Sequence, residues 1–240
     1  MQALIFDCDG VLVDTEKDGH RVAFNQAFAD LGLGIAWDVD LYGRLLKIAG
    51  GKERIKHYFE TSGWPRAAGV DHAAFVAEIH KRKTALFTDI IATGRLPLRP
   101  GIARIVDEAV AAPVRLGVCT TSNPQSVAGV LDLLGPRRKA AFECVLAGDI
   151  VAKKKPDPEI YNLAKERLGL GPHQCLVIED SRNGLLAARG AGLPCVITTS
   201  TYTREEDFSG ARKVVSELGD PPNAVVTLAD LAALASQHAA

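Results

Sequence analysis

The chain has 240 residues, 47% of them apolar, and its 28 basic and 29 acidic residues leave a formal net charge of −1. This length and apolar content allow a substantial buried core, in one large domain or in two unequal ones. The balanced charge provides no general attraction for nucleic acid or for an anionic membrane surface, and no apolar run is long enough to span a membrane. We therefore expect a soluble protein that binds neither, with charged pockets for small molecules left open.

The amino terminus enters a strand-like apolar run directly, without a signal or transit segment. The cysteines are odd in number, and none forms a C-x-x-C pair. They mostly lie in apolar strand-like runs, at Cys8, Cys119, Cys144, Cys175 and Cys195. We interpret them as buried reduced thiols, which suits a reducing compartment.

The first predicted element is a buried strand over residues 3–6, because this apolar run is too short for an ordinary helix. Two carboxylates, Asp7 and Asp9, follow it directly, and Gly10 comes next. In open α/β sheets, ligands bind at the carboxyl ends of the strands. The two acids cannot both be buried without a counter-ion, and a bound cation is the simplest remedy. We interpret residues 7–15 as a metal-assisted nucleophile site.

A helical pattern begins after Asp14 and continues for about eighty residues. One helix is expected to end at Gly32, a short one to begin with Asp38 as its N-cap, and a third to cover residues 51–61. A longer amphipathic helix is predicted from an apolar stripe made of Phe75, Ile79, Leu86 and Ile90, with Val76, Lys83 and Phe87 beside it. This part of the chain is predicted to be an all-helical insertion.

Residues 96–101 contain two prolines and a glycine, which indicates a return linker. Helices and strands alternate after it, and such alternation predicts an α/β fold with a parallel sheet wrapped by helices. Strands are expected at 114–120, 144–147, 175–179 and 195–198, helices at 101–112, 124–134, 157–168 and 181–189, and a terminal helix that frays at 228–240.

Three later strands are also followed by polar residues that could form one site with Asp7 and Asp9. Thr120, Ser122 and Asn123 precede a helix that begins near Pro124, so their side chains and the helix N-terminus can donate to a phosphate. The alternative is an N-cap with spare hydroxyl groups.

The second of these strand ends is basic and the third is acidic. Lys153 and Lys154 are expected in a solvated loop, whereas Lys155 precedes a proline and can neutralise a carboxylate and a phosphate from a strand-end cleft. Glu179 and Asp180 follow an apolar strand and complete an oxygen-rich site with the first two acids. Oxygen ligands of this kind suit Mg²⁺. Taken alone, an Asp before a helix would be a cap.

The ordered set Asp7-x-Asp9-Gly-Val, Thr120, Lys155-Pro and Glu179-Asp180 resembles the haloacid dehalogenase-like (HAD) phosphatase superfamily over essentially the whole chain. The resemblance implies a Rossmann-like core of residues 1–14 and 97–240 with a helical cap of residues 15–96. It also implies a Mg²⁺ ion held by the Asp7 side chain, the Asp9 backbone carbonyl and Asp180, with Glu179 bound to the ion or one step behind it.

The residue types then suggest a mechanism. Asp7 would attack phosphorus and form an aspartyl-phosphate, and Asp9 would protonate the leaving sugar oxygen and later accept a proton from water. Lys155 and the Thr120 hydroxyl would offset the charge of the transferring phosphoryl group.

A narrower set of segments resembles the CbbY-type xylulose-1,5-bisphosphate phosphatases, in the chloroplast form of plants and green algae. The segments include Asp14-Thr15-Glu16, His20-Arg21, Trp37-Asp38, Gly50-Gly51-Lys52-Glu53-Arg54 and Leu98-Arg99-Pro100-Gly101. This resemblance implies removal of the 1-phosphate from a sugar bisphosphate that inhibits Rubisco, which yields xylulose 5-phosphate. It implies a monomer in the chloroplast stroma, or alternatively in the cytoplasm of a photosynthetic bacterium.

The second phosphate of a bisphosphate needs cations outside the core. Lys52, Arg54 and Lys83 are the candidates, with a solvated helix face as the alternative for each. Glu16 and His20 begin the cap, and we interpret His20 as a polar substrate contact or a hinge because no histidine pair has zinc-ligand spacing. Tyr42 is either a sugar contact or a half-buried tyrosine without a function.

Three rival functions share parts of this pattern. A phosphomutase similar to β-phosphoglucomutase would use the same core residues, and only the cap segments favour a phosphatase. A dehalogenase would not need Asp9. A catalytically inactive sugar-phosphate sensor is disfavoured because a competent residue occupies every catalytic position.

Overall fold

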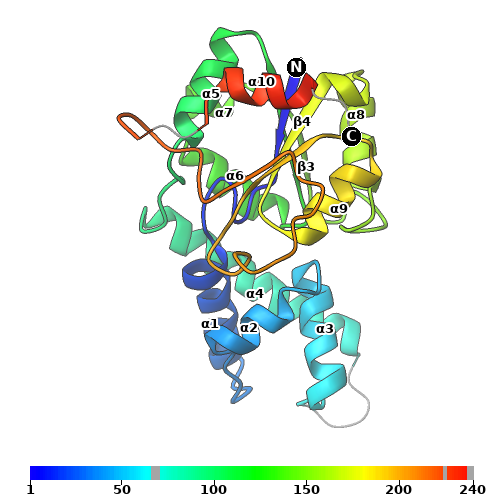
Figure 1. Ribbon diagram of the computed structural model, residues 1–240. Helices are drawn as coiled ribbons and strands as arrows, with labels where there is room; N and C mark the ends of the chain where they lie inside the picture. The colour runs from blue at the N-terminus through cyan, green and yellow to red at the C-terminus, as the bar shows by residue number, and fades with distance from the viewer. Residues whose placement is uncertain (66–70, 224–225, 237–240) are drawn as a thin grey trace. The chain divides into compact units, whose positions relative to one another are not determined.

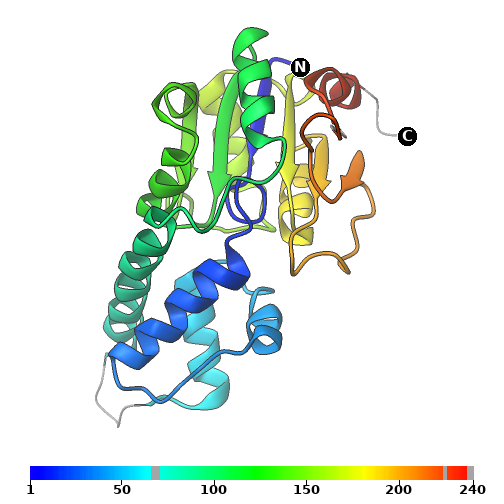
Figure 2. The ribbon, with the colours of Figure 1, turned by 90° about the vertical axis from the view of Figure 1, so that its left-hand side faces the viewer.

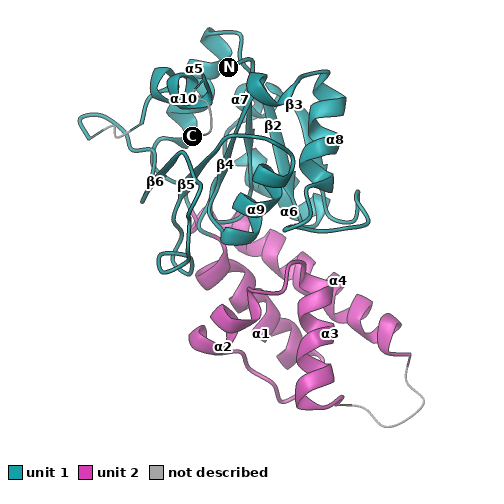
Figure 3. Cartoon of the chain, turned by 45° about the vertical axis from the view of Figure 1, so that its right-hand side comes forward, with its two compact units in different colours: residues 1–14, 97–240 teal, residues 15–96 magenta. Residues whose placement is uncertain are grey.

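The structure is a computed structural model that describes residues 1–65, 71–223 and 226–236. The chain divides into two compact units, shown in teal and magenta in Figure 3. Unit 1 consists of Met1–Asp14 and Pro97–Ala240, and unit 2 consists of Thr15–Leu96. Within the described ranges, no helix is long and apolar enough to cross a membrane.

Unit 1 is built on a parallel sheet, of which Figure 1 labels β3 and β4. Its strands lie side by side in the order β3-β2-β1-β4-β5-β6. The central strand, β1, is buried on both faces, which explains why it reads as a continuous apolar run in the sequence. The strand bounds are β1 Ala3–Phe6, β2 Arg115–Thr120, β3 Phe142–Ala147, β4 Cys175–Glu179, β5 Cys195–Thr198 and β6 Lys213–Val215.

The predicted α/β fold and its first five strands are confirmed. Strand β3 begins at Phe142, two residues before its predicted start, and edge strand β6 was not predicted. All five cysteines are free and buried, as expected, and they are spread over five strands. Cys8 follows β1, whereas the other four lie within β2, β3, β4 and β5.

Helices cover both faces of the sheet, and Figure 2 shows α5 in front of the strands. On the face that carries Ala3 and Ile5, α8 and α9 bury an apolar core that includes Ile160 and Leu185. The helices of unit 1 are α5 Ile102–Ala111, α6 Pro124–Asp132, α7 Pro136–Lys139, α8 Glu159–Leu168, the 3-10 helix η2 Pro172–Gln174, α9 Arg182–Gly190 and α10 Leu228–Ser236. The short helix α7 was not predicted, and the fraying expected at residues 237–240 lies outside the described residues.

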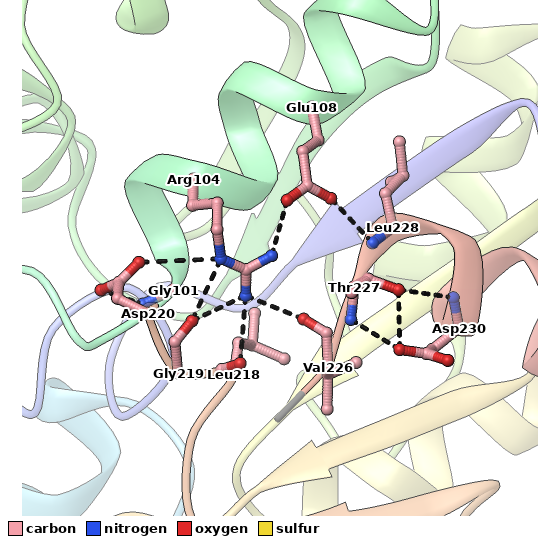
Figure 4. Close-up of polar contacts among 10 residues, drawn as sticks. All are labelled: Gly101, Arg104, Glu108, Leu218, Gly219, Asp220, Val226, Thr227, Leu228 and Asp230. Carbon is pink, nitrogen blue, oxygen red and sulfur yellow. Dashed lines mark hydrogen bonds and ion pairs between the residues drawn. The ribbon is translucent and has the colours of Figure 1, made fainter. Parts of the chain in front are cut away.

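Arg104 of α5 fixes the chain between β6 and α10 (Figure 4). Its guanidinium donates to the backbone carbonyls of Leu218, Gly219 and Val226 at 2.7–3.1 Å. Glu108 accepts from Arg104 Nη1 at 2.6 Å and from the first backbone N–H of α10 at 2.9 Å. This cluster holds the terminal helix against unit 1.

All the regular elements among the described residues of unit 2 are helices. Asp38 caps α2 by accepting from Leu41 N at 2.7 Å, as predicted, and Asp71 caps α4 in the same way. The bounds are a π-helical turn η1 Glu16–His20, α1 Arg21–Asp30, α2 Val39–Leu45, α3 Gly51–Ser62 and α4 His72–Ala92.

The buried stripe of α4 differs from the predicted one in its second half. Phe75, Ile79 and Phe87 are buried as expected. Leu86 and Ile90 are only partly covered, and Ile91, which was not predicted to belong to the stripe, is buried. All three are apolar, so the sequence pattern alone does not distinguish two neighbouring faces of the same helix.

Candidate active site

The register of the sheet brings the predicted acids together at one edge. Phe6 of β1 pairs with Val118 of β2 and with Ile178 of β4, so the residues that follow these strands lie at the same level. Asp7 N donates to the Ile178 carbonyl at 2.9 Å, which continues the pairing one residue beyond β1. Asp7 and Glu179 thereby become neighbours across the strands.

Lys155, from the loop after β3, lies between these two acids. Its ammonium donates to Asp7 Oδ1 at 2.6 Å, to Glu179 Oε1 at 2.6 Å and to the Cys119 carbonyl at 2.7 Å. These contacts use all three of its donors. The side chain is only 6% exposed, so the ammonium is held in a fixed position. Neighbouring Lys154 is less solvated than expected, because it pairs with Asp149 at 2.9 Å and is 14% exposed.

The cluster around Lys155 contains more carboxylate groups than ammonium groups. Burial raises the pKa of Asp7 to about 8 against the lowering effect of Lys155, and Glu179 and Asp9 add to the rise. Burial alone would lower the pKa of Lys155, but Asp7 and Glu179 outweigh it and raise that pKa. The site therefore has a deficit of positive charge in the absence of a further cation.

The arrangement of oxygen atoms fits a divalent cation. Asp7, Glu179 and Asp180 each offer a carboxylate oxygen within 4.8 Å of the others, and all three residues are buried. A set composed only of oxygen suits Mg²⁺. Gly10, with a φ of 78°, makes room for this group because a Cβ atom on it would overlap Asp180 Oδ2.

The side chain of Asp9 is not part of this acidic group. Its Oδ2 accepts a hydrogen bond from the Ser122 hydroxyl, so the end of β2 orients this carboxylate. Thr120 is buried, and its hydroxyl oxygen accepts from Ser122 N at 3.1 Å. Asn123 takes the alternative role considered for it, because its side-chain oxygen caps α6 by accepting from Gln125 N at 2.8 Å.

Tyr161 was not among the predicted site residues. It is fully buried on α8, and its hydroxyl donates to Glu179 Oε1 at 2.6 Å, the same oxygen that accepts from Lys155. The Lys155 ammonium also lies 5.0 Å from the centre of the Tyr161 ring. A tyrosine on the otherwise apolar buried face of α8 is the signal that would have drawn attention to it.

In unit 2, Glu16, Tyr42 and Arg54 form one cluster. Tyr42 is fully buried, so the half-buried tyrosine considered as an alternative is wrong, and its hydroxyl donates to Glu16 Oε2 at 2.5 Å. Arg54 donates to the Tyr42 hydroxyl at 3.1 Å and to the carbonyls of Leu45 and Ile48 at 3.2 and 3.3 Å. With 7% exposure, Arg54 does not lie on a solvated face.

His20 and Lys83 form a second cluster in unit 2. The Lys83 ammonium lies 2.6 Å from His20 Nδ1, which must be the acceptor because an ammonium group only donates. Lys83 is 6% exposed, so a solvated face is wrong for it too. The His20 ring stacks on Phe87 at 3.8 Å, and Lys83 lies 4.8 Å from the ring centre of Phe24. The third candidate cation, Lys52, is partly exposed in the first turn of α3.

Comparison with known proteins extends this description. The family model of haloacid dehalogenase-like hydrolases matches residues 1–192. A CBBY-like protein of Arabidopsis thaliana is 54% identical over 224 residues, which cover 92% of this chain and 70% of that protein. Protein CbbY of Cupriavidus necator is 44% identical over 247 residues, covering 99% and 97% of the two chains.

Solved structures show the same fold. The crystal structure of CbbY from Rhodobacter sphaeroides in complex with phosphate has a TM-score of 0.87 and 40% identity, covering 96% of this chain and 99% of that one. An Asp-to-Asn variant of the Rhodobacter protein, crystallised in complex with xylulose 1,5-bisphosphate, has a TM-score of 0.87 and 39% identity with the same coverage.

Proposed function

This chain belongs to the haloacid dehalogenase-like hydrolases and, among them, to the CbbY phosphatases, and from that membership we propose that it removes the 1-phosphate of xylulose 1,5-bisphosphate. The products would be xylulose 5-phosphate and inorganic phosphate. The complex of Rhodobacter sphaeroides CbbY with xylulose 1,5-bisphosphate supports this choice of substrate. The observation that carries the chemistry is the buried Asp7 carboxylate, which Lys155 fixes beside an acidic group.

Asp7 is the nucleophile in this proposal. Its Oδ1 is bound to Lys155, whereas its Oδ2 receives no hydrogen bond from the described residues and is the oxygen that attacks phosphorus. A bond forms between Oδ2 and phosphorus as the bond from phosphorus to the sugar oxygen breaks. Lys155 keeps the carboxylate in one orientation, which reduces the entropy lost on reaching the transition state.

Asp9 is the acid and then the base. The Ser122 hydroxyl donates to its Oδ2, and this contact supports a fixed orientation for the proton transfers. Asp9 gives a proton to the leaving sugar oxygen, and its carboxylate then takes a proton from the water that attacks the aspartyl-phosphate. Asp7 is regenerated and inorganic phosphate leaves.

Mg²⁺ is the proposed cofactor. The Asp7 and Asp180 side chains and the Asp9 backbone carbonyl would hold it, with Glu179 behind them because Oε1 of Glu179 is bound to Lys155 and Tyr161. The bound ion would supply positive charge that offsets the charge of the phosphoryl group. Lys155 and the Thr120 hydroxyl are the protein groups proposed to share this task.

The sugar and its second phosphate are assigned to residues of unit 2. We assign the phosphate to Lys52, Arg54 and Lys83, of which Arg54 also donates to Tyr42, Leu45 and Ile48. Glu16 and His20 are proposed as polar contacts of the sugar. The similarity to a plant CbbY-like protein supports a place in the chloroplast stroma, and a monomer remains our expectation.

The test is a phosphate-release assay with and without Mg²⁺. We expect xylulose 1,5-bisphosphate to be hydrolysed in preference to ribulose 1,5-bisphosphate, fructose 1,6-bisphosphate and glucose 1-phosphate. Isomerisation of glucose 1-phosphate without free phosphate would instead indicate a phosphomutase. Asp7→Asn should abolish turnover while leaving substrate binding measurable, and retained turnover would contradict the covalent mechanism.

A further inference from the structure

The loop that carries Asp7 and Asp9 is bound by Arg99, a residue from the segment between unit 2 and α5. The backbone N–H of Arg99 donates to the Leu12 carbonyl at 2.9 Å, and its guanidinium donates to the Gly10 carbonyl. Two carbonyls of the loop are thus bound by a single residue 87 or more positions further along the chain. The loop also has contacts of its own, such as Gly10 N to the Val13 carbonyl at 2.8 Å.

The same guanidinium is also bound to the ends of two strands. It donates to the carbonyl of Thr198, the last residue of β5, at 3.1 Å and to that of Thr199 at 2.7 Å. It also donates to the carbonyl of Ser216, just after β6. Arginine is the side chain that offers five N–H donors in a rigid plane, so it can join three segments of backbone at once. A lysine at this place could not satisfy the same set of carbonyls.

The Gly10 carbonyl matters because Gly10 lies directly against Asp180. A Cβ atom on Gly10 would overlap the Asp180 carboxylate, so the position of Gly10 determines the space open to that acid. Burial lowers the pKa of Arg99 whereas Asp14 and Asp180 raise it, which places both carboxylates within electrostatic reach of the guanidinium. Arg99 is therefore connected to the metal-binding acids by contact and by charge.

A second anchor holds the end of the loop to the same strand end. Asp14 Oδ2 accepts from Thr201 N at 3.0 Å and from the Thr201 hydroxyl at 2.6 Å. Residues 198–201 thus bind the loop directly through Asp14 and indirectly through Arg99.

We propose that Arg99 is a positioning residue of the active site, which holds the loop of residues 7–14 in place through the Gly10 and Leu12 carbonyls and keeps Gly10 clear of Asp180. The inference rests on the proposed roles of Asp7, Asp9 and Asp180 in phosphate transfer. Its consequence is that Arg99, which binds the loop through backbone carbonyls, affects both turnover and Mg²⁺ binding.

The competing explanation is that Arg99 only stabilises the fold, and Arg104 provides a matched control for it. Arg104 lies five positions further along and also binds backbone carbonyls of distant segments, namely those of Leu218, Gly219 and Val226 (Figure 4). None of these belongs to the loop of residues 7–14. A lysine at either position should lower the melting temperature, but only Arg99→Lys should alter the active site.

The experiment compares Arg99→Lys, Arg104→Lys and the unaltered protein. We expect Arg99→Lys to lower kcat about 10- to 100-fold with KM changed less than about threefold, since small misplacements of reacting groups are that costly. Calorimetry without substrate should show Mg²⁺ binding weakened about tenfold. Amide hydrogen exchange of residues 8–14 should also accelerate in Arg99→Lys. Arg104→Lys should leave kcat, Mg²⁺ binding and this exchange within about twofold of the unaltered protein.

Equal kcat values for the two lysine variants would overturn the proposal, and so would unchanged exchange in a slowed Arg99→Lys. If Arg99→Lys does not fold, amide hydrogen exchange in the unaltered protein still tests the proposal. A loop of residues 7–14 that Arg99 holds in place should exchange about as slowly as β1. Fast exchange of residues 10–13 there would contradict the inference. Amide hydrogen exchange and Mg²⁺ binding are both measured without substrate. A protein that does not hydrolyse xylulose 1,5-bisphosphate would therefore contradict the proposed function, and the role of Arg99 could still be tested.

Discussion

The hydroxyl of Tyr161 donates a 2.6 Å hydrogen bond to Oε1 of Glu179, an oxygen that also accepts from Lys155 at the same distance. Both lone pairs of that oxygen are therefore used within the protein. The contact joins α8 to the end of β4 and stabilises a carboxylate that is 1% exposed. Removing one of the two donors of so deeply buried an oxygen should be measurable in stability and in catalysis.

Tyr161→Phe tests this contact. The phenyl ring keeps the surface that lies 5.0 Å from the Lys155 ammonium, and only the hydroxyl donor is lost. We expect the free energy of unfolding to fall by about 1–3 kcal/mol, since a buried acceptor loses a partner. We also expect kcat to fall roughly tenfold, as for other groups that orient metal ligands. Urea unfolding and phosphate release measure the two effects.

Tyr58→Phe is the control for that change. Tyr58 of α3 packs edge-on against Trp37 and is partly exposed, so loss of its hydroxyl should change stability by less than about 0.5 kcal/mol. Equal stability of both variants would show that the Tyr161 hydroxyl contributes nothing to the site.

The stability of the metal-free protein should depend on pH through Asp7. The pKa of this carboxyl is raised by burial from 3.8 to about 8 in the folded protein. Between these values the folded protein holds a proton that the unfolded chain has released, so stability should fall as the pH rises through this window. Unfolding in urea with a chelator present, at several pH values from about 4 to about 8, measures the slope.

Mg²⁺ should reverse the trend, because the ion binds the ionised carboxylates and its affinity therefore increases with pH. Asp7→Asn removes the titrating group and should flatten the pH dependence in the chelated protein. If Asp7→Asn and the unaltered protein showed the same slope, another group would be responsible.

A comparison of Gly10→Ala with Gly32→Ala separates the effect of backbone strain from the effect of crowding the Asp180 carboxylate. Both glycines have a left-handed backbone, with φ of 78° and 64°, so alanine should cost roughly 1–2 kcal/mol of stability at either position. Nothing lies within 4 Å of a Cβ atom at Gly32, whereas one at Gly10 would overlap Asp180. Mg²⁺ affinity, measured by calorimetry, should therefore fall at least about tenfold in Gly10→Ala only. Unchanged Mg²⁺ binding in Gly10→Ala would remove Asp180 from the proposed metal site.

Tyr42→Phe tests the cluster of unit 2. The change deprives Glu16 of a donor at 2.5 Å and Arg54 of an acceptor at 3.1 Å, while Arg54 keeps its contacts to Leu45 and Ile48. We expect a loss of about 1–3 kcal/mol in the free energy of unfolding. KM for the sugar bisphosphate should rise as Glu16 loses its orientation.

Lys56→Ala breaks only an exposed pair with Glu60 at 3.7 Å on the same unit, and it should alter stability by less than about 1 kcal/mol. A KM unaffected by Tyr42→Phe would argue against Glu16 as a substrate contact.

The local sequence pattern was sufficient to predict the strands that are buried on both faces. Strands β1, β4 and β5 appear as short apolar runs because every one of their residues is covered. Strand β6 has three residues, and Lys213 and Val214 are exposed, so no apolar run marks it. Its place at the edge of the sheet depends on pairing with β5, which the local pattern does not reveal.

The acids of the site were predictable because each directly follows a strand, and the parallel register then brings them together. Tyr161 and Arg99 were missed as site residues because their roles depend on distant partners. Tyr161 meets Glu179, 18 positions away, and Arg99 meets Ser216, 117 positions away. The burial of Tyr42, Arg54 and Lys83 was missed for a related reason, since charge and polarity in one helix do not reveal the neighbour that covers them.

The distribution of the cysteines allows local unfolding of individual strands to be detected by cysteine alkylation. One thiol follows β1 and one lies on each of β2, β3, β4 and β5, all are buried, and burial raises the pKa of each, so almost none is a thiolate in the closed protein. An alkylating reagent can therefore reach a given cysteine only while its strand is exposed. Peptide mapping of the alkylated residues would give a strand-by-strand record of local unfolding, without any engineered label.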